Sequence, residues 1–165
     1  MLAPIMKLQP ERCDMAKFNF LEEPKGGVGM EIIAADEDAV CNAAVTALCL
    51  YMWNQDKVIE RESYTVSWYG FDHRTALVGL LSEVLFRMEN DQLVFKRFET
   101  LSIEEVDDLD ERHRRKQIRI TGRAFGEPYD PERHVLRFPV TAVLLTKLRL
   151  KPHAEGLRFY CVLDA

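Results

Sequence analysis

The order of helical and strand patterns along this chain is the feature that most constrains its fold. Small apolar residues recur every three or four positions across residues 38–53, and leucine-rich residues do so across residues 73–88. Elsewhere β-branched and aromatic residues alternate with polar ones, as is typical of half-buried strands. The sequence therefore predicts two early helices and seven or eight strands, at residues 17–21, 28–34, 58–69, 93–101, 117–125, 135–137, 140–150 and 157–163.

Turn-forming residues separate several of these strands closely. Glycine and proline cluster at residues 22–27, 126–131 and 152–156. Connections this short favour antiparallel neighbours. We therefore expect an α+β fold, with a mostly antiparallel or mixed β-sheet and the two α-helices packed on one face.

The length of 165 residues predicts one domain. Residues 1–15 contain Pro4 and Pro10 and show no clear periodicity, so we expect a flexible N-terminal extension before a single domain over residues 16–165. This extension has neither a long apolar core nor a small-residue cleavage site, and we do not interpret it as a secretory signal.

Charge and cysteine usage exclude several classes of protein. The chain has 22 basic and 27 acidic residues, a formal charge of −5, which argues against strong direct binding of nucleic acid. No apolar run approaches the ~20 residues that span a bilayer, so no membrane partner is expected. The four cysteines, Cys13, Cys41, Cys49 and Cys161, form no CxxC pair and show no zinc spacing. We interpret them as small buried thiols of a cytoplasmic protein.

A charged segment follows the fourth expected strand. Residues 99–111 hold seven acidic side chains, and Arg112, Arg114, Arg115 and Lys116 follow at once. We expect a solvated connection whose two halves neutralise each other. The alternative is that the basic cluster contacts RNA or an acidic partner.

The sequence contains no recognisable catalytic constellation. A Gly-x-Ser-x-Gly elbow, a P-loop and a His-Glu-x-x-His motif are all absent. The glycines of residues 26–29 lie between two expected strands, so they predict a hairpin loop and no phosphate-binding helix start. The four histidines are scattered over turns and helix starts. We therefore expect no enzyme activity of the chain's own.

Carboxylates in loops are the more informative polar residues. A hard divalent cation needs several oxygen ligands, which often come from separate turns. Asp164 stands out because it ends the apolar strand of residues 159–163, although it also fits a solvated residue near the chain end. The candidate ligands of this kind are Glu22, Glu23, Asp56, Asp130 and Asp164.

The order and spacing of several motifs resemble those of the archease family. The most specific block is Gly-Glu-Pro-Tyr-Asp-Pro-Glu-Arg-His at residues 126–134, which is similar to the family's GEPxDPxRH-type turn. The other matching segments lie at residues 20–22, 28–29, 38–52, 81–86, 93–95, 140–143 and 162–164. The resemblance spans about residues 16–165.

This resemblance implies a fold and a function. Archeases are small α+β accessory proteins that assist an RtcB-type RNA ligase in tRNA splicing and RNA repair. They promote guanylylation of the ligase's active-site histidine, and a metal-binding acidic cluster is implicated. The resemblance therefore implies an RtcB-type ligase as partner, and a divalent cation such as calcium, magnesium or manganese as cofactor.

The chain departs from the family pattern where that cluster is expected. Gly27 falls at the aspartate of the family's His-Thr-Ala-Asp turn, and Asn54 falls at a second aspartate after the first helix. The resemblance thus implies Asp164 as the best-matched metal ligand, with Asn54 and Glu23 as further candidates. A cation site loses most of its attraction when two charges are absent. The alternative is an archease-fold interaction scaffold that has lost both the metal site and ligase activation.

The strand after the motif block departs from the family as well. Thr141 falls where the family has a lysine, and leucines at residues 144–145 replace a Thr-Tyr pair. Together with the missing aspartates, these changes favour retention of the family's fold over retention of its activity.

Overall fold

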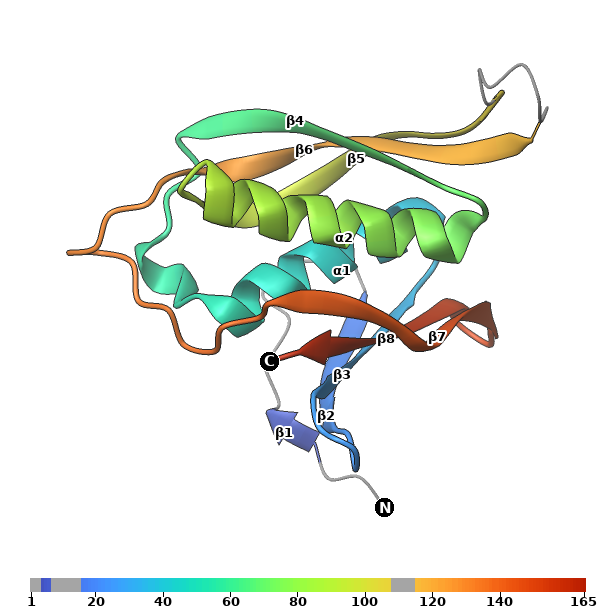
Figure 1. Cartoon of the computed structure of the whole chain (residues 1–165), viewed down its shortest axis with the longest axis horizontal. Helices are drawn as coiled ribbons and strands as arrows, with labels where there is room; N and C mark the ends of the chain where they lie inside the picture. The colour runs from blue at the N-terminus through green and yellow to red at the C-terminus, as the bar shows by residue number, and fades with distance from the viewer. Residues whose placement is uncertain (1–3, 7–15, 108–114) are drawn as a thin grey trace.

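The computed structural model of the chain describes residues 4–6, 16–107 and 115–165, and places two helices between two β-sheets (Figure 1). The elements in chain order are β1 (Pro4–Met6), β2 (Lys17–Glu22), β3 (Val28–Ala34), α1 (Glu37–Met52), the short 3-10 helix η1 (Gln55–Lys57), β4 (Glu62–Gly70), α2 (His73–Asn90), β5 (Leu93–Asp107), β6 (Lys116–Pro128), β7 (Ala142–His153) and β8 (Gly156–Asp164).

Each strand pairing among the described residues is antiparallel. One sheet has five strands in the order β1-β2-β3-β8-β7, and the other has three in the order β4-β6-β5. Helices α1 and α2 contact strands of both sheets (Figure 1). The α+β class is therefore confirmed, and the strands are divided between two sheets with the helices between them.

Helix α1 shows why two sheets form. Its buried residues are not confined to one stripe, because Ala43, Ala44 and Val45 are consecutive and all three are fully buried. A helix that is apolar on most sides must be covered on more than one side. Periodicity along the sequence finds the stripe of a helix but not the number of sheets that cover it.

Both helix starts lie where the sequence predicts them. The Asp36 carboxylate accepts a hydrogen bond from the backbone N–H of Ala39 at 2.9 Å and begins α1. Asp72 begins α2 in the same way, and its own backbone N–H donates to Thr75 Oγ1, which completes a capping box. These bonds satisfy N–H groups that have no partner inside the helix.

The core lies on both faces of the helix pair. The larger sheet contributes Phe20, Met30, Ile32 and Phe159, and the smaller sheet contributes Phe95, Ile120 and other fully buried side chains. The prediction of buried thiols is confirmed for the three cysteines in the described ranges, while Cys13 lies outside them. Burial raises the pKa of Cys49 and of Cys161 to about 12, and it raises that of Cys41 as well.

The acidic segment differs from its expected form. Residues up to Asp107 continue β5, and β6 begins at Lys116, so the expected solvated connection over residues 99–111 is wrong for its first nine residues. Opposite charges face each other across the two strands, with Glu104 paired to Arg119 and Glu105 to Lys116. Such cross-strand pairs favour the ladder over a loop. Of the basic cluster, Arg115 and Lys116 lie within the described residues, and Arg112 and Arg114 lie outside them.

Two strand boundaries also differ from expectation. The expected strand at residues 135–137 is wrong, because this segment contributes only an isolated bridge between Leu136 and Trp53. Strand β4 begins at Glu62, four residues later than predicted, because the backbone at Ile59 is bound to a side chain of the motif block instead of to a strand.

The start of the chain is described only in part. Pro4 and Met6 pair with Leu21 and Phe20, which adds β1 to the edge of the larger sheet. The other residues of the expected extension lie outside the described ranges, so the flexible extension stays a prediction. Within the described ranges, neither helix combines the length and the apolar character that crossing a membrane requires.

Candidate functional site

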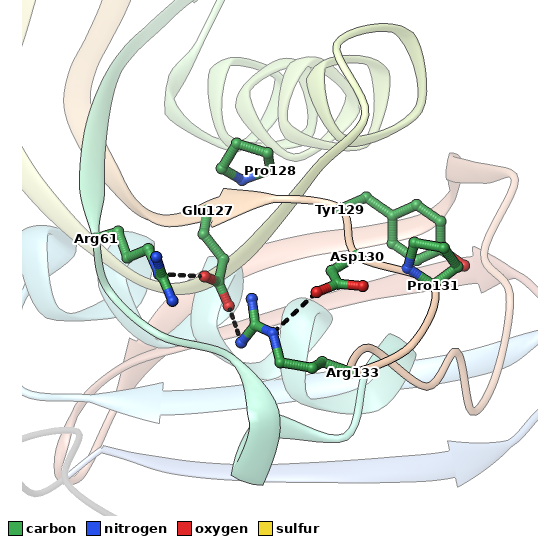
Figure 2. Close-up of a pocket in the computed structure, with 7 residues that line it drawn as sticks. All are labelled: Arg61, Glu127, Pro128, Tyr129, Asp130, Pro131 and Arg133. Atoms are coloured by element: carbon green, nitrogen blue, oxygen red, sulfur yellow. Dashed lines mark hydrogen bonds and ion pairs between the residues drawn. The ribbon is translucent and has the colours of Figure 1, made fainter.

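The motif block at residues 126–134 is organised around the buried carboxylate of Glu127, whose side chain is 1% exposed. Arg61 Nε lies 2.9 Å from one carboxylate oxygen. Arg133 Nη1, His134 Nε2 and the backbone N–H of Ile59 lie 3.0, 2.8 and 3.0 Å from the other. Figure 2 shows the contacts of Glu127 with Arg61 and Arg133. The bond from Arg133 is the largest cause that lowers the pKa of Glu127, to about 2, against the opposing effect of burial.

The histidine of the block has a defined proton arrangement. His134 Nδ1 accepts a hydrogen bond from the Asp130 backbone N–H at 2.9 Å. The ring proton of a neutral imidazole must then lie on Nε2, which donates to Glu127. Asp130 in turn accepts from Glu132 N at 3.0 Å and from Arg133 Nε at 3.1 Å, bonds that lower its pKa. These bonds fix the shape of the turn.

A shallow pocket of about 460 Å³ lies over this turn (Figure 2). Its charged groups are two guanidinium groups and two carboxylates, so their formal charges cancel. Each is already bound to another, as the dashed lines of Figure 2 show. The lining residues are Arg61, Glu127, Pro128, Tyr129, Asp130, Pro131 and Arg133.

The end of α1 is joined directly to this block. Trp53 packs on Tyr129 with ring centres 5.6 Å apart, and Asn54 N donates to Val135 O at 3.0 Å. The side-chain oxygen of Asn54 accepts from Asp56 N at 3.2 Å and caps η1. Asn54, one of the predicted metal ligands, therefore has its amide oxygen engaged in a local turn.

Asp164, the best-matched predicted ligand, ends β8 with its side chain exposed. Its backbone oxygen accepts from Thr141 N at 2.8 Å and from Thr141 Oγ1 at 3.2 Å. Its neighbour Leu163 pairs with Val28, so Asp164 lies beside the turn that joins β2 to β3. The segment that follows the motif block, residues 135–141, therefore bonds to Asn54 at its start and to Asp164 at its end.

Glu23, the third predicted ligand, lies in that same turn with its side chain only 4% exposed. One of its oxygens accepts from Lys147 Nζ and the other from Tyr160 Oη. These two hydrogen bonds, in that order, lower the pKa of the Glu23 carboxyl against the effect of burial. Glu23 is therefore the buried member of an ion pair whose other member, Lys147, is 46% exposed.

The residues present do not fit a divalent cation well. Gly27 has φ +87°, and a Cβ there would lie 2.8 Å from Leu163 O, so this turn has no room for an aspartate. Across residues 4–6, 16–107 and 115–165, no group of three or more His, Cys, Asp or Glu side chains has the arrangement of a metal site. The assignment of Asp164, Asn54 and Glu23 as ligands stays a prediction.

Sequence reasoning missed Arg61, Lys147 and Tyr160. Arg61 lies before β4, far along the chain from the carboxylate that it binds, and no motif contains it. Lys147 and Tyr160 lie on different strands and meet at Glu23 only in the folded chain. A charged residue inside a strand pattern was the only available signal, and it is a weak one.

The fold is that of an α+β protein with two helices between antiparallel sheets. Its most distinctive polar cluster is the GEPYDPERH turn, which closes around a buried glutamate. Residues 18–165 match the model of the Archease protein family (MTH1598/TM1083). The chain belongs to the archease family.

Individual relatives agree with this assignment. A protein named archease from Methanosarcina acetivorans is 33% identical over 93 residues, which are 56% of this chain and 58% of that protein. Archease from Sulfurisphaera tokodaii is 23% identical over 137 residues, 83% of this chain and 90% of that protein. The chain thus spans less than two thirds of the length of the Methanosarcina relative.

A solved structure shows the same fold. The solution structure of Methanobacterium thermoautotrophicum protein 1598 superimposes with a TM-score of 0.67 at 21% identity, covering 91% of this chain and 98% of that one. This likeness supports the two-sheet architecture described above.

Proposed function

We propose that this chain is an accessory protein of an RtcB-type RNA ligase and promotes guanylylation of the ligase in tRNA splicing or RNA repair. The observation that carries the proposal is the family match over residues 18–165, which includes the motif block. Proteins of this family act through a partner, so the relevant feature is a surface and not a catalytic centre.

The chemistry of the motif block supports an accessory role. Glu127 is buried, accepts three hydrogen bonds on one oxygen and pairs with Arg61 through the other, so both of its oxygens are engaged in contacts within the chain. Its pKa of about 2 also makes it a poor proton acceptor near neutral pH. The block therefore serves to hold the turn that carries residues 129–141.

The exposed carboxylate of Asp164 is the side chain best placed to act on the partner. It lies at the tip of β8, beside the β2–β3 turn and next to Thr141 at the end of the motif segment. A negative group at such a tip can bind a cationic or hydrogen-bond-donating group of the ligase.

A guanylylation assay tests the proposal. The ligase of the same organism is incubated with labelled GTP, with and without the full chain, and the protein–GMP adduct is followed over time. We expect faster adduct formation with the chain present. Asp164→Ala should lower the stimulated rate about tenfold, which corresponds to ~1.4 kcal/mol for one charge-assisted contact.

Glu89→Ala is a matched control, because Glu89 is an exposed acidic residue at the end of α2. It should leave the stimulation unchanged. An equal loss in both variants would show that Asp164 has no specific part in the activity.

The second candidate is an archease-fold scaffold that binds the ligase without activating it. The observations that favour it are the absence of space for an aspartate at Gly27 and the pairing of Glu23 with Lys147. A chain that co-purifies with the ligase but leaves the guanylylation rate unchanged would support this scaffold.

A further inference from the structure

We propose that the ammonium group of Lys147 is a built-in cation that takes the place of a divalent metal ion at the β2–β3 tip. The tip then folds around Glu23 without metal. This inference concerns the chain's own stability and is independent of the proposed ligase partnership.

The backbone at Lys147 is shaped to reach Glu23. The pairing of β7 with β8 is irregular between Leu144 and Arg149, and Lys147 lies within that irregularity. Its φ is +59°, in the left-handed region that residues with a side chain seldom adopt. Such a conformation persists when surrounding contacts hold it, and the contact here is the ion pair with Glu23.

The carboxylate that it binds is buried, while the Lys147 side chain is itself 46% exposed. The Glu23 side chain is 4% exposed, and each of its two oxygens has a donor, Lys147 on one and Tyr160 on the other. A buried carboxylate needs a compensating positive charge, because transfer from water to the interior removes its hydration. Lys147 supplies one charge and so leaves the pair neutral.

The surrounding sheet makes room for this arrangement. Gly29 lies beneath the Tyr160 ring, since a Cβ there would be 2.2 Å from Tyr160 Oη. Gly29 therefore lets the hydroxyl approach Glu23. The group at the tip thus comes from three separate segments, which is the mark of a built site and not of a chance surface pair.

A metal ion would have little to bind in its place. Calcium takes six to eight oxygen ligands, and magnesium requires near-octahedral oxygen coordination. Gly27 offers no side chain, and each Glu23 oxygen already accepts a hydrogen bond within the chain. A neutral Glu23–Lys147 pair also has little attraction for a second cation.

Thermal unfolding of the full chain tests the inference. The midpoint of the wild-type chain should be the same in EDTA and in millimolar calcium, magnesium or manganese chloride. Lys147→Met should lower the midpoint by roughly 4–8 °C, because it leaves a buried carboxylate without its cation. Lys151→Met is the control, since Lys151 is an exposed lysine on the same strand, and its midpoint should stay at the wild-type value.

A double variant provides a second measurement if Lys147→Met alone folds poorly. Glu23→Gln with Lys147→Met removes both charges and should recover part of the lost midpoint. The proposal is overturned if divalent cations raise the wild-type midpoint and Glu23→Gln abolishes that rise. It is also overturned if Lys147→Met behaves as Lys151→Met does. Neither result depends on the guanylylation assay, so the two proposals can fail separately.

Discussion

Glu127 shows how a single motif residue serves the fold of its turn. Its carboxylate accepts from Arg61, Arg133, His134 and the backbone of Ile59, which belong to two separate parts of the chain, residues 59–61 and 133–134. The motif was recognisable in the sequence, but the direction in which Glu127 points was not. Burial inside the turn, and not exposure to a substrate, accounts for its many partners.

We expect the stability contributed by Glu127 to depend on pH. Its pKa is lowered from 4.5 to about 2 in the folded chain, so the folded state favours the ionised form. That contribution, at most about 3 kcal/mol, is fully present above pH 4.5 and is lost as the pH falls toward 2. Urea unfolding of wild type and Glu127→Gln from pH 7 to pH 2 should show a difference that shrinks over this interval.

Glu132→Gln is the matched control for this measurement, because Glu132 is exposed in the same turn. Its unfolding free energy should follow the wild-type value at every pH. A gap between wild type and Glu127→Gln that stays constant down to pH 2 would contradict the role assigned to the ionised carboxylate.

At the scale of elements, the helices were the most predictable part of the fold. Their periodicity and their capping aspartates are local signals, and both helices begin within one residue of the expected position. The end of β5 was less predictable, because a run of acidic residues resembles a loop until the facing strand supplies Arg119 and Lys116. Cross-strand pairs are invisible in one strand's sequence.

The capping box of α2 leads to a prediction about stability. Asp72→Ala removes the acceptor for Thr75 N and for the Thr75 hydroxyl. It should reduce the unfolding free energy by about 1 kcal/mol and the midpoint by about 2–4 °C, measured by thermal circular dichroism.

Ser82→Ala, an exposed change in the middle of the same helix, should not lower the midpoint. If Asp72→Ala unfolds at the same temperature as Ser82→Ala, the capping box does not stabilise α2 measurably.

At the scale of the whole molecule, the two sheets share one pair of helices. Because α1 and α2 contact strands of both sheets, neither sheet can lose its packing without exposing the helix faces that the other sheet also needs. We therefore expect the chain to unfold in one cooperative step.

The two tryptophans provide a direct test of this cooperativity. Trp53 follows α1 and packs on the motif block, while Trp68 lies on β4 and contacts α2 at Gly79. Tryptophan fluorescence and far-ultraviolet circular dichroism should give the same urea midpoint. Separate midpoints, or a fluorescence change in two phases, would show that the sheets unfold independently.

The sequence by itself determined the local features: where the helices begin, which residues form most of the strands, and which family the chain resembles. These follow from periodicity, capping residues and turn residues, which act over a few neighbouring positions. Only the tertiary structure decided that the strands divide into two sheets, that Glu127 is buried under Arg61, and that Lys147 binds Glu23. Each of these depends on residues that are distant in the chain and meet only when the helices are covered on both sides.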